Sequence, residues 1–383
     1  MLQSTTIHQV TVAMLSAVCM LAASLPAQAF EGEEVMTGGG YPALVKFMPG
    51  EPDQALVVFV PGAHHTARIA YGGHEGSQDE DFLAHWLVEE GYNFLGVSYP
   101  IATRNPVMKE AHPELTAQDW GRQTAEIAKR VVDEHGLSNR IIVIGWSMGG
   151  KIVQPVSEAA EEAGLDLDFY LSFAATPPVT GAISMDAEIA MAASGYADRS
   201  DLYAGWLEQL ADNNADNEGR TIIDERTYLA DYVGDMSINL QGYGLRYRDG
   251  QFVRDHWADV EDFKSYDFAS LPTIAMIMPN EVADGRHALT DQANWGLFLT
   301  NKILHGDIGG NKVDLDALPE ERWFALIDLV RAAPERLSVE SNGNHFFFVG
   351  EAGARETARA VRTLEHRVHA FESELEDLIG STH

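Results

Sequence analysis

A serine lies in a segment whose spacing is typical of an activated nucleophile. Ser147 occupies the centre of Gly145-Trp146-Ser147-Met148-Gly149, directly after the β-branched run Ile141–Ile144. Such a run predicts a buried parallel strand, and the glycines leave room for a sharp turn into a helix over residues 152–163. This turn would present the Ser147 hydroxyl at the carboxyl edge of a sheet, where the amide of Met148 faces a developing oxyanion. The pattern favours nucleophilic attack by Ser147 over an inert serine in an ordinary strand-turn-helix unit.

The rest of the chain predicts the elements that would position this serine. Hydrophobic segments bounded by short loops alternate with segments of helical periodicity. Strands are expected over residues 41–47, 55–60, 92–99, 140–145, 167–174, 271–278 and 336–340, and helices over 81–90, 117–134 and 152–163. This alternation predicts an α/β protein with a mainly parallel sheet flanked by helices on both faces.

The alternation stops between residues 176 and 267, which include an acidic, Asn-rich stretch at 211–219. We expect a mainly helical cap here, inserted before the strand at 271–278 and lying over the carboxyl edge of the sheet. Its aromatic residues would form either the core of the cap or a substrate cleft: Trp206, Tyr228, Tyr232, Tyr243 and Trp257. The predicted organisation is a leader at 1–29, a core at 30–175 and 268–383, and a cap at 176–267.

The order of these motifs resembles the α/β-hydrolase superfamily over roughly residues 40–175 and 268–378. In that family the serine is followed by an acid after a later strand and by a histidine near the end of the domain. The segment Gly343-Asn344-His345-Phe346, after the last predicted strand, is similar to the family's Gly-x-His-aromatic turn. The resemblance implies that His345 takes the proton of Ser147 and returns it to the leaving group.

The resemblance also implies a carboxylate after the strand at 271–278, where two acids are available. The family spacing from Pro272-Thr273 leads to Glu281, and Asp284 lies three residues further. Either side chain could hold the imidazole tautomer if the loop bends suitably, and we favour Glu281. The stretch 278–281 departs from the family pattern because it lacks the usual glycine and aspartate.

A second oxyanion donor is implied in the loop Pro61-Gly62-Ala63-His64-His65, where the family often has His-Gly. By position, the amide of Ala63 would pair with that of Met148 to form the oxyanion hole. We expect no metal at His64 and His65, because adjacent histidines diverge on an extended chain. The implied chemistry requires no cofactor.

Composition restricts the partners of the protein. The formal net charge is −32, with 58 acidic and 26 basic residues, and the acids are spread along the whole chain. A nucleic acid partner is excluded, because no basic block offsets the repulsion of a phosphate backbone. The expected partner is a small-molecule ester or other acyl substrate.

This charge predicts that salt stabilises the fold. Repulsion among surface carboxylates weakens when counterions screen them, so the melting temperature should be higher in molar salt than in dilute buffer. Thermal unfolding at increasing salt measures this effect. A melting temperature that falls or stays flat would contradict the prediction.

The first 29 residues resemble a signal peptide. They contain no charged side chain, are nearly all apolar from Val10 to Leu25, and end in Ala27-Gln28-Ala29, which suits cleavage before Phe30. An uncleaved anchor is the alternative, but the run is short for a bilayer and is interrupted by polar residues and proline. We therefore expect a periplasmic or secreted protein with no stable membrane insertion after cleavage. The single cysteine, Cys19, lies in this leader, so the mature chain would have no disulfide.

Apolar residues recur at helical spacing over 351–378. This stripe predicts a final helix that packs on the sheet, and the alternative is that its distal turns bind a second subunit.

These observations predict a serine hydrolase that cleaves a carboxylic ester or related acyl bond through an acyl-enzyme. Two alternatives stay open, because one fold serves many functions. The first is a capped peptidase or aminopeptidase that acts on short peptides. The second is a ligand-binding protein that has kept the fold without turnover.

Overall fold

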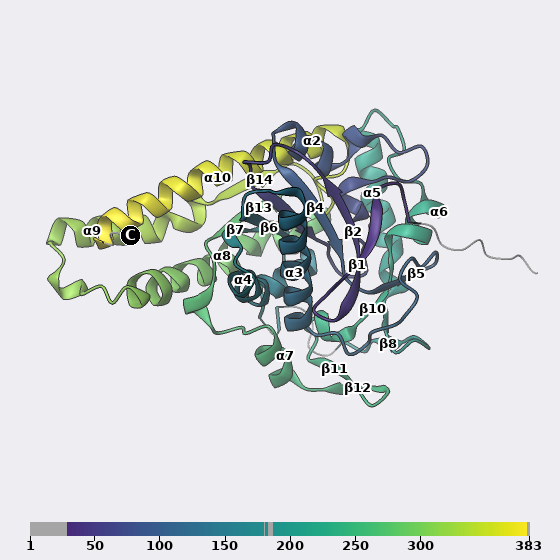
Figure 1. Cartoon of the computed structure of the whole chain (residues 1–383), viewed down its shortest axis with the longest axis horizontal. Helices are drawn as coiled ribbons and strands as arrows, with labels where there is room; N and C mark the ends of the chain where they lie inside the picture. The colour runs from purple at the N-terminus through teal and green to yellow at the C-terminus, as the bar shows by residue number, and fades with distance from the viewer. Residues whose placement is uncertain (1–28, 180, 183–186, 381–383) are drawn as a thin grey trace, which may run out of the picture.

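Eight strands form the central sheet of the protein (Figure 1). The computed structural model describes residues 29–179, 181–182 and 187–380, so the predicted leader lies outside the described residues apart from Ala29. The strand order is β1 (Glu33–Gly38), β2 (Tyr41–Met48), β4 (Asn93–Ser98), β3 (Leu56–Val60), β6 (Arg140–Trp146), β7 (Asp166–Phe173), β13 (Ile274–Pro279) and β14 (Ser338–Ser341).

The sheet is mainly parallel. Strand β2 pairs antiparallel with β1 and β4, and every other neighbouring pair runs parallel. The predicted strands are all present within a few residues, and the mainly parallel sheet with its flanking helices is the α/β architecture that the sequence indicated. Strand β1 was not predicted, because three of its six residues are exposed and no apolar run marks it.

Side chains of successive strand residues alternate between the two faces of the sheet. On β6, Ile141 and Val143 point to the face covered by α3 (Ala117–His135), α4 (Val153–Glu162) and α8 (Gly285–Lys302). Ile142 and Ile144 point to the opposite face, which α1 (Arg68–Tyr71), α2 (Leu83–Glu89) and α10 (Glu351–Ile379) cover. The two apolar layers explain why the central strands consist of unbroken hydrophobic runs.

The segment between β7 and β13 combines helices with two small sheets. Helical parts predominate, as predicted, and the main ones are α5 (Tyr203–Asp216), α6 (Glu225–Thr227) and α7 (His256–Asp262). The unpredicted strands are β8 (Ala190–Met191), β9 (Ala197–Asp198), β10 (Gly234–Met236), β11 (Leu245–Arg248) and β12 (Gln251–Arg254). Because β10 pairs with β5 (Ile101–Thr103), which follows β4, this segment is bound to the core by main-chain hydrogen bonds. Its limits as a separate cap stay a prediction.

A helical arm extends from the sheet between β13 and β14. Figure 1 shows α9 (Glu320–Arg336) beside the C-terminal part of α10, both reaching beyond the sheet at the left. The predicted stripe of α10 is buried within the chain at Val361, Leu364, Val368, Phe371 and Leu375. Association of two chains through this helix therefore stays a prediction. Among the described residues, no helix is long and apolar enough to span a membrane.

Candidate active site

Ser147 occupies a strained turn between β6 and α4. Its φ is 53°, in the left-handed region, and the 3-10 helix η2 (Ser147–Ile152) begins at the same residue. A side chain in this region costs about 1–2 kcal/mol, and such strain persists only where the surrounding structure imposes it. The predicted sharp turn from strand to helix is thus present.

Close packing around the turn explains its glycines. A Cβ atom at Gly145 would lie 1.8 Å from the hydroxyl oxygen of Tyr170, which donates a hydrogen bond to the carbonyl of Gly149. A Cβ atom at Gly62 would lie 2.7 Å from the Cβ atom of Ser147. Glycine at these positions lets the neighbouring loop approach the serine.

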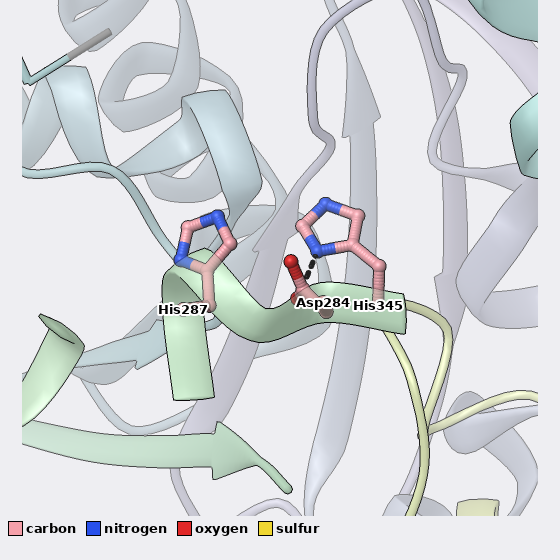
Figure 2. Close-up of side chains that lie close together, drawn as sticks. All are labelled: Asp284, His287 and His345. Atoms are coloured by element: carbon pink, nitrogen blue, oxygen red, sulfur yellow. Dashed lines mark hydrogen bonds and ion pairs between the residues drawn. The ribbon is translucent and has the colours of Figure 1, made fainter. Parts of the chain in front are cut away.

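His345 lies on the loop after β14, and its partner is Asp284. The Nδ1 atom of His345 is 2.7 Å from Oδ2 of Asp284 (Figure 2), across 61 residues of sequence. The structure therefore pairs His345 with Asp284, the alternative acid, and not with the preferred Glu281. The 3-10 turn η7 (Val282–Asp284) follows β13 and carries the chain past Glu281, whose backbone amide binds the carbonyl of Gly343 instead.

The pKa shifts of Asp284 and Glu281 also favour Asp284 as the charged partner of His345. Burial alone would raise the pKa of Asp284, but the charge and hydrogen bond of His345, with His287 and Arg286, bring it below its usual value. Asp284 therefore stays ionised and stabilises an imidazolium. Burial raises the pKa of Glu281, and so do carboxylates of the acidic helix α5.

One cavity of about 220 Å³ brings the remaining predicted site residues together. Its lining includes Ser147, His345, Asp284, Ala63 and Met148. The other lining residues are Lys151, Thr176, Leu202, Trp206, Gln209, Gln241, Tyr243, Arg286 and His287. Ser147 and His345 thus face a shared space from elements that are far apart in sequence.

The five aromatic residues of the predicted cap divide between cleft and core. Trp206 and Tyr243 line the cavity, whereas Tyr228 and Tyr232 are buried in the hydrophobic core. Trp257 is 69% exposed and lies outside the lining. Sequence periodicity does not separate these cases, because each depends on how the cap folds over the sheet.

The loop that carries Ala63 is held by residues 228–241. His64 Nδ1 lies 2.9 Å from the carbonyl oxygen of Gly234, and its Nε2 lies 3.1 Å from the amide nitrogen of Gln241. The backbone amide of Ala63 has no hydrogen-bond partner within the described part of the chain. The amide of Met148 is at the start of η2, where helices leave their first N–H groups unpaired. Both amides are therefore candidates to bind an oxyanion.

His64 and His65 serve as structural hydrogen-bonding groups. Burial lowers the pKa of His64 to about 4 and that of His65 to about 3, so both rings are neutral. The Nδ1 atom of His65 contacts the carbonyl of Ala63, and its Nε2 contacts the hydroxyl of Tyr228. Both nitrogens of each ring are thus engaged by protein groups, which leaves no free ligand atom for a metal.

Helix α5 holds the loop of His345 against the core. The side-chain amide of Asn213 donates to the carbonyls of Phe346 (2.8 Å) and Val349 (3.0 Å), and its oxygen accepts from Asn344. Gln209 accepts a hydrogen bond from the backbone amide of His345. These residues were not predicted from the sequence, because the acidic and Asn-rich composition of α5 is typical of an exposed surface.

Asn213→Ala should lower the free energy of unfolding by about 3 kcal/mol, because three buried hydrogen bonds are lost and their partners stay buried. Urea denaturation measures the change. The control is Asn311→Ala on an exposed loop, where the amide makes one hydrogen bond to the carbonyl of Asp307, and a change within about 0.5 kcal/mol is expected. Equal effects in the two variants would contradict the role of Asn213.

Lys151 and Arg286 are two basic residues of the cavity that were also not predicted from the sequence. Lys151 is only 1% exposed and follows Ser147 by four residues, while Arg286 follows Asp284 by two. The position of Lys151 directly before the apolar pair Ile152-Val153 is the sequence signal that could have identified it as a buried residue. Burial lowers the pKa of Lys151 from 10.5 to about 7; Arg286 lowers it further, and Asp259 opposes the shift.

The depressed pKa of Lys151 predicts a pH-dependent stability difference. Between about pH 7 and 10.5 the unfolded chain binds more protons at this residue than the folded chain, so rising pH stabilises the folded form. Relative to Lys151→Met, the wild type should gain up to about 1.4 kcal/mol per pH unit between pH 7 and 9. Urea denaturation across this range tests it, with Lys129→Met on α3, where Lys129 pairs with Asp133, as control. Parallel curves for wild type and Lys151→Met would contradict the prediction.

A metal site at Asp284, His287 and His345 is disfavoured by the existing bonds. One ligand atom from each residue lies within 4.8 Å of the others (Figure 2). However, Nδ1 of His287 contacts Asp291, and its Nε2 accepts from the Arg286 guanidinium at 2.6 Å. A divalent cation would have to displace a guanidinium and break the bond between His345 and Asp284.

Comparisons with known proteins find similar solved structures at low sequence identity. No family model and no curated protein matches the chain. Similar solved structures include a hyperthermophilic esterase from the archaeon Pyrobaculum calidifontis, at 14% identity and a TM-score of 0.43, covering 88% of this chain and 83% of that one. A bacterial heroin esterase matches at 13% identity and a TM-score of 0.41, with coverage of 91% and 86%. A thioesterase domain from the curacin biosynthetic pathway matches at 12% and 0.40, with coverage of 88% and 100%. At these identities the likeness concerns the fold alone.

Proposed function

We propose that this protein is a serine hydrolase that cleaves a carboxylic ester or related acyl bond. The observation that carries the proposal is the pairing of His345 with Asp284 in a cavity that also exposes Ser147 on its strained turn. A nucleophile, a base oriented by a carboxylate, and two candidate oxyanion donors then share one small space.

In the acylation step, the Ser147 oxygen attacks the acyl carbon while His345 takes the hydroxyl proton. The carbonyl oxygen becomes an oxyanion, which the amides of Ala63 and Met148 stabilise. The bond from the acyl carbon to the leaving group breaks, and the leaving alcohol takes the proton from His345. Asp284 keeps the Nδ1–H tautomer and stabilises the imidazolium throughout.

In the deacylation step, His345 takes a proton from water as the water oxygen attacks the acyl-enzyme. The same two amides stabilise the second oxyanion. Collapse of this intermediate breaks the bond between Ser147 and the acyl group, and His345 returns the proton to the serine oxygen. The products are a free carboxylic acid and a regenerated site.

The composition of the cavity argues against an aminopeptidase. Recognition of a peptide amine requires a free carboxylate, and Asp284 is the one carboxylate among the described lining residues. It is already bound to His345, and the basic side chains of the lining are Lys151 and Arg286. A cationic substrate group would be repelled from this cavity.

Labelling with a fluorophosphonate tests the proposal against a non-catalytic binding protein. We expect the wild type to form a covalent adduct on the peptide that contains Ser147, because the probe reports an activated serine hydroxyl. His345→Ala should label far more slowly, since the base is lost while Ser147 remains. A folded wild-type protein that resists the probe would contradict the hydrolase proposal and favour a binding protein.

We also propose that the chain is exported to the periplasm or secreted, and that cleavage leaves Phe30 as the first residue. The backbone nitrogen of Phe30 lies 2.6 Å from Oε2 of the buried Glu33, and its ring lies 3.7 Å from the guanidinium carbon of Arg68. Cleavage before Phe30 would place the new ammonium group beside that carboxylate. The intact mass of the protein recovered from an exporting host measures the cleavage position, and retention of residues 1–29 would contradict it.

A further inference from the structure

Basic side chains outnumber carboxylates in the lining of the cavity, although the protein as a whole is strongly acidic. The chain as a whole has a formal charge of −32, yet the lining contributes Lys151 and Arg286 against the single carboxylate of Asp284. That carboxylate is engaged by its hydrogen bond to His345. Neither Lys151 nor Arg286 forms an ion pair with a carboxylate in the described part of the chain. Two basic side chains without a carboxylate partner therefore face the space in which a substrate would bind.

Lys151 is buried without a charged partner. Its Nζ atom donates to the carbonyl oxygens of Pro177 (2.8 Å) and Val179 (3.3 Å), which leaves one N–H of the ammonium group for another acceptor. Asp259, the carboxylate that favours its charged form, is itself bound to Arg246. Burial of an ammonium without a counter-ion is unfavourable, so a bound anion would stabilise the charged lysine.

Arg286 is held in a defined orientation. Its Nη1 donates to the hydroxyl of Thr176 at 3.0 Å, and its Nη2 donates to Nε2 of His287 at 2.6 Å. His287 is fixed in turn by the buried carboxylate of Asp291 at 2.9 Å from Nδ1. A guanidinium has five N–H donors, so three remain for a ligand, and its planar fork matches the geometry of a carboxylate.

We propose that the natural substrate carries a carboxylate, which Arg286 and Lys151 bind while the reacting acyl carbon lies at Ser147. The inference deepens the proposed function and rests on it, because it assigns a substrate class to the same site. A cavity of about 220 Å³ restricts the bound part of the substrate to a small compound, since a cavity of roughly 150 Å³ holds one benzene ring. Half-esters of short dicarboxylic acids, with four or five carbons in the acid, meet both requirements.

A matched pair of esters tests this proposal. Monomethyl glutarate carries a carboxylate, and its carboxamide analogue has nearly the same shape without the charge. We expect kcat/KM, measured by methanol release in a single buffer, to be about 10-fold or more higher for the carboxylate, because charge-assisted hydrogen bonds are lost in the analogue. The ratio of the two values isolates the charge from the chemistry that both esters share.

Variants of Arg286 test whether the preference for the carboxylate ester arises in the cavity. Arg286→Gln should reduce the ratio to within a few fold of unity, whereas Arg286→Lys, which keeps the charge but loses the fork, should retain part of it. The control is Arg122→Gln on α3, which removes the same charge outside the cavity and should leave the ratio unchanged. An equal rate for both esters, or a preference that survives Arg286→Gln, would overturn the inference.

Protection from labelling separates this inference from the proposed function. Glutarate monoamide should slow fluorophosphonate labelling of Ser147 at lower concentration than the uncharged glutaramide, whether or not the methyl esters are turned over. Labelling that both compounds slow equally, or that neither slows, contradicts the carboxylate site and leaves the hydrolase proposal intact. A folded wild type that is not labelled at all contradicts both.

Discussion

Ser147→Ala should lower kcat by about 10⁶-fold for any ester that the wild type hydrolyses, because the variant retains no nucleophile for the acyl-enzyme. The binding cavity should be unchanged, so the variant should still fold cooperatively. Turnover of the purified variant, with circular dichroism to confirm folding, measures this effect. Residual activity near that of the wild type would show that another group attacks the acyl carbon, and the proposed mechanism would fall.

The strained backbone at Ser147 adds a second readout to this experiment. At a φ of 53°, alanine retains the steric conflict of its Cβ atom with the backbone, whereas glycine avoids it. Ser147→Gly should therefore unfold with a free energy about 1 kcal/mol higher than Ser147→Ala, although neither variant has activity. Equal stabilities in urea denaturation would indicate that the turn is not strained at this residue.

Asp284→Asn should lower kcat by about 10⁴-fold, because an amide in place of the carboxylate favours the wrong tautomer of His345. An asparagine can donate a hydrogen bond to Nδ1, which places the ring proton on Nε2, where it blocks removal of the Ser147 proton. The distance of 2.7 Å between Oδ2 of Asp284 and Nδ1 of His345 is the reason to expect that the base depends on this carboxylate. Steady-state turnover of the substrate used for the wild type measures the loss.

Glu281→Gln is the matched control for this substitution. Glu281 lies three residues earlier on the same turn and makes no side-chain hydrogen bond within the described residues. Its replacement should change turnover by less than about twofold, as expected for a surface residue away from the reacting groups. Equal loss in both variants, or full activity in both, would refute the assignment of Asp284.

The sequence predicted the framework because its signals are local. The run Ile141–Ile144 consists of residues that pack on both faces of a sheet, and the glycines beside Ser147 leave room for close contacts that a larger side chain would block. Such patterns determine the strands, their parallel pairing and the turn at the serine without knowledge of distant contacts. Strand β1 escaped prediction because an edge strand with exposed residues has no comparable apolar run.

The partners of the site residues were determined only by the tertiary structure. The choice between Glu281 and Asp284 depends on how the turn after β13 faces the loop of His345, which lies 61 residues away from Asp284 in sequence. The hydrogen bond from the side chain of Asn213 to the carbonyl of Phe346 in that loop joins residues 133 positions apart in sequence. Local periodicity contains no information about such distances.

Contacts between distant segments also explain why the two basic residues of the cavity have no carboxylate partner. Lys151 and Arg286 lie near the predicted serine and acid in sequence, but their unpaired state depends on which of the 58 acidic side chains fold nearby. The sequence by itself therefore determined the scaffold, Ser147 and the histidine of the terminal turn, since each follows from local main-chain conformation. Only the folded chain decided the acid, the support of His345 and the charge of the cavity, because these depend on distant segments meeting in space.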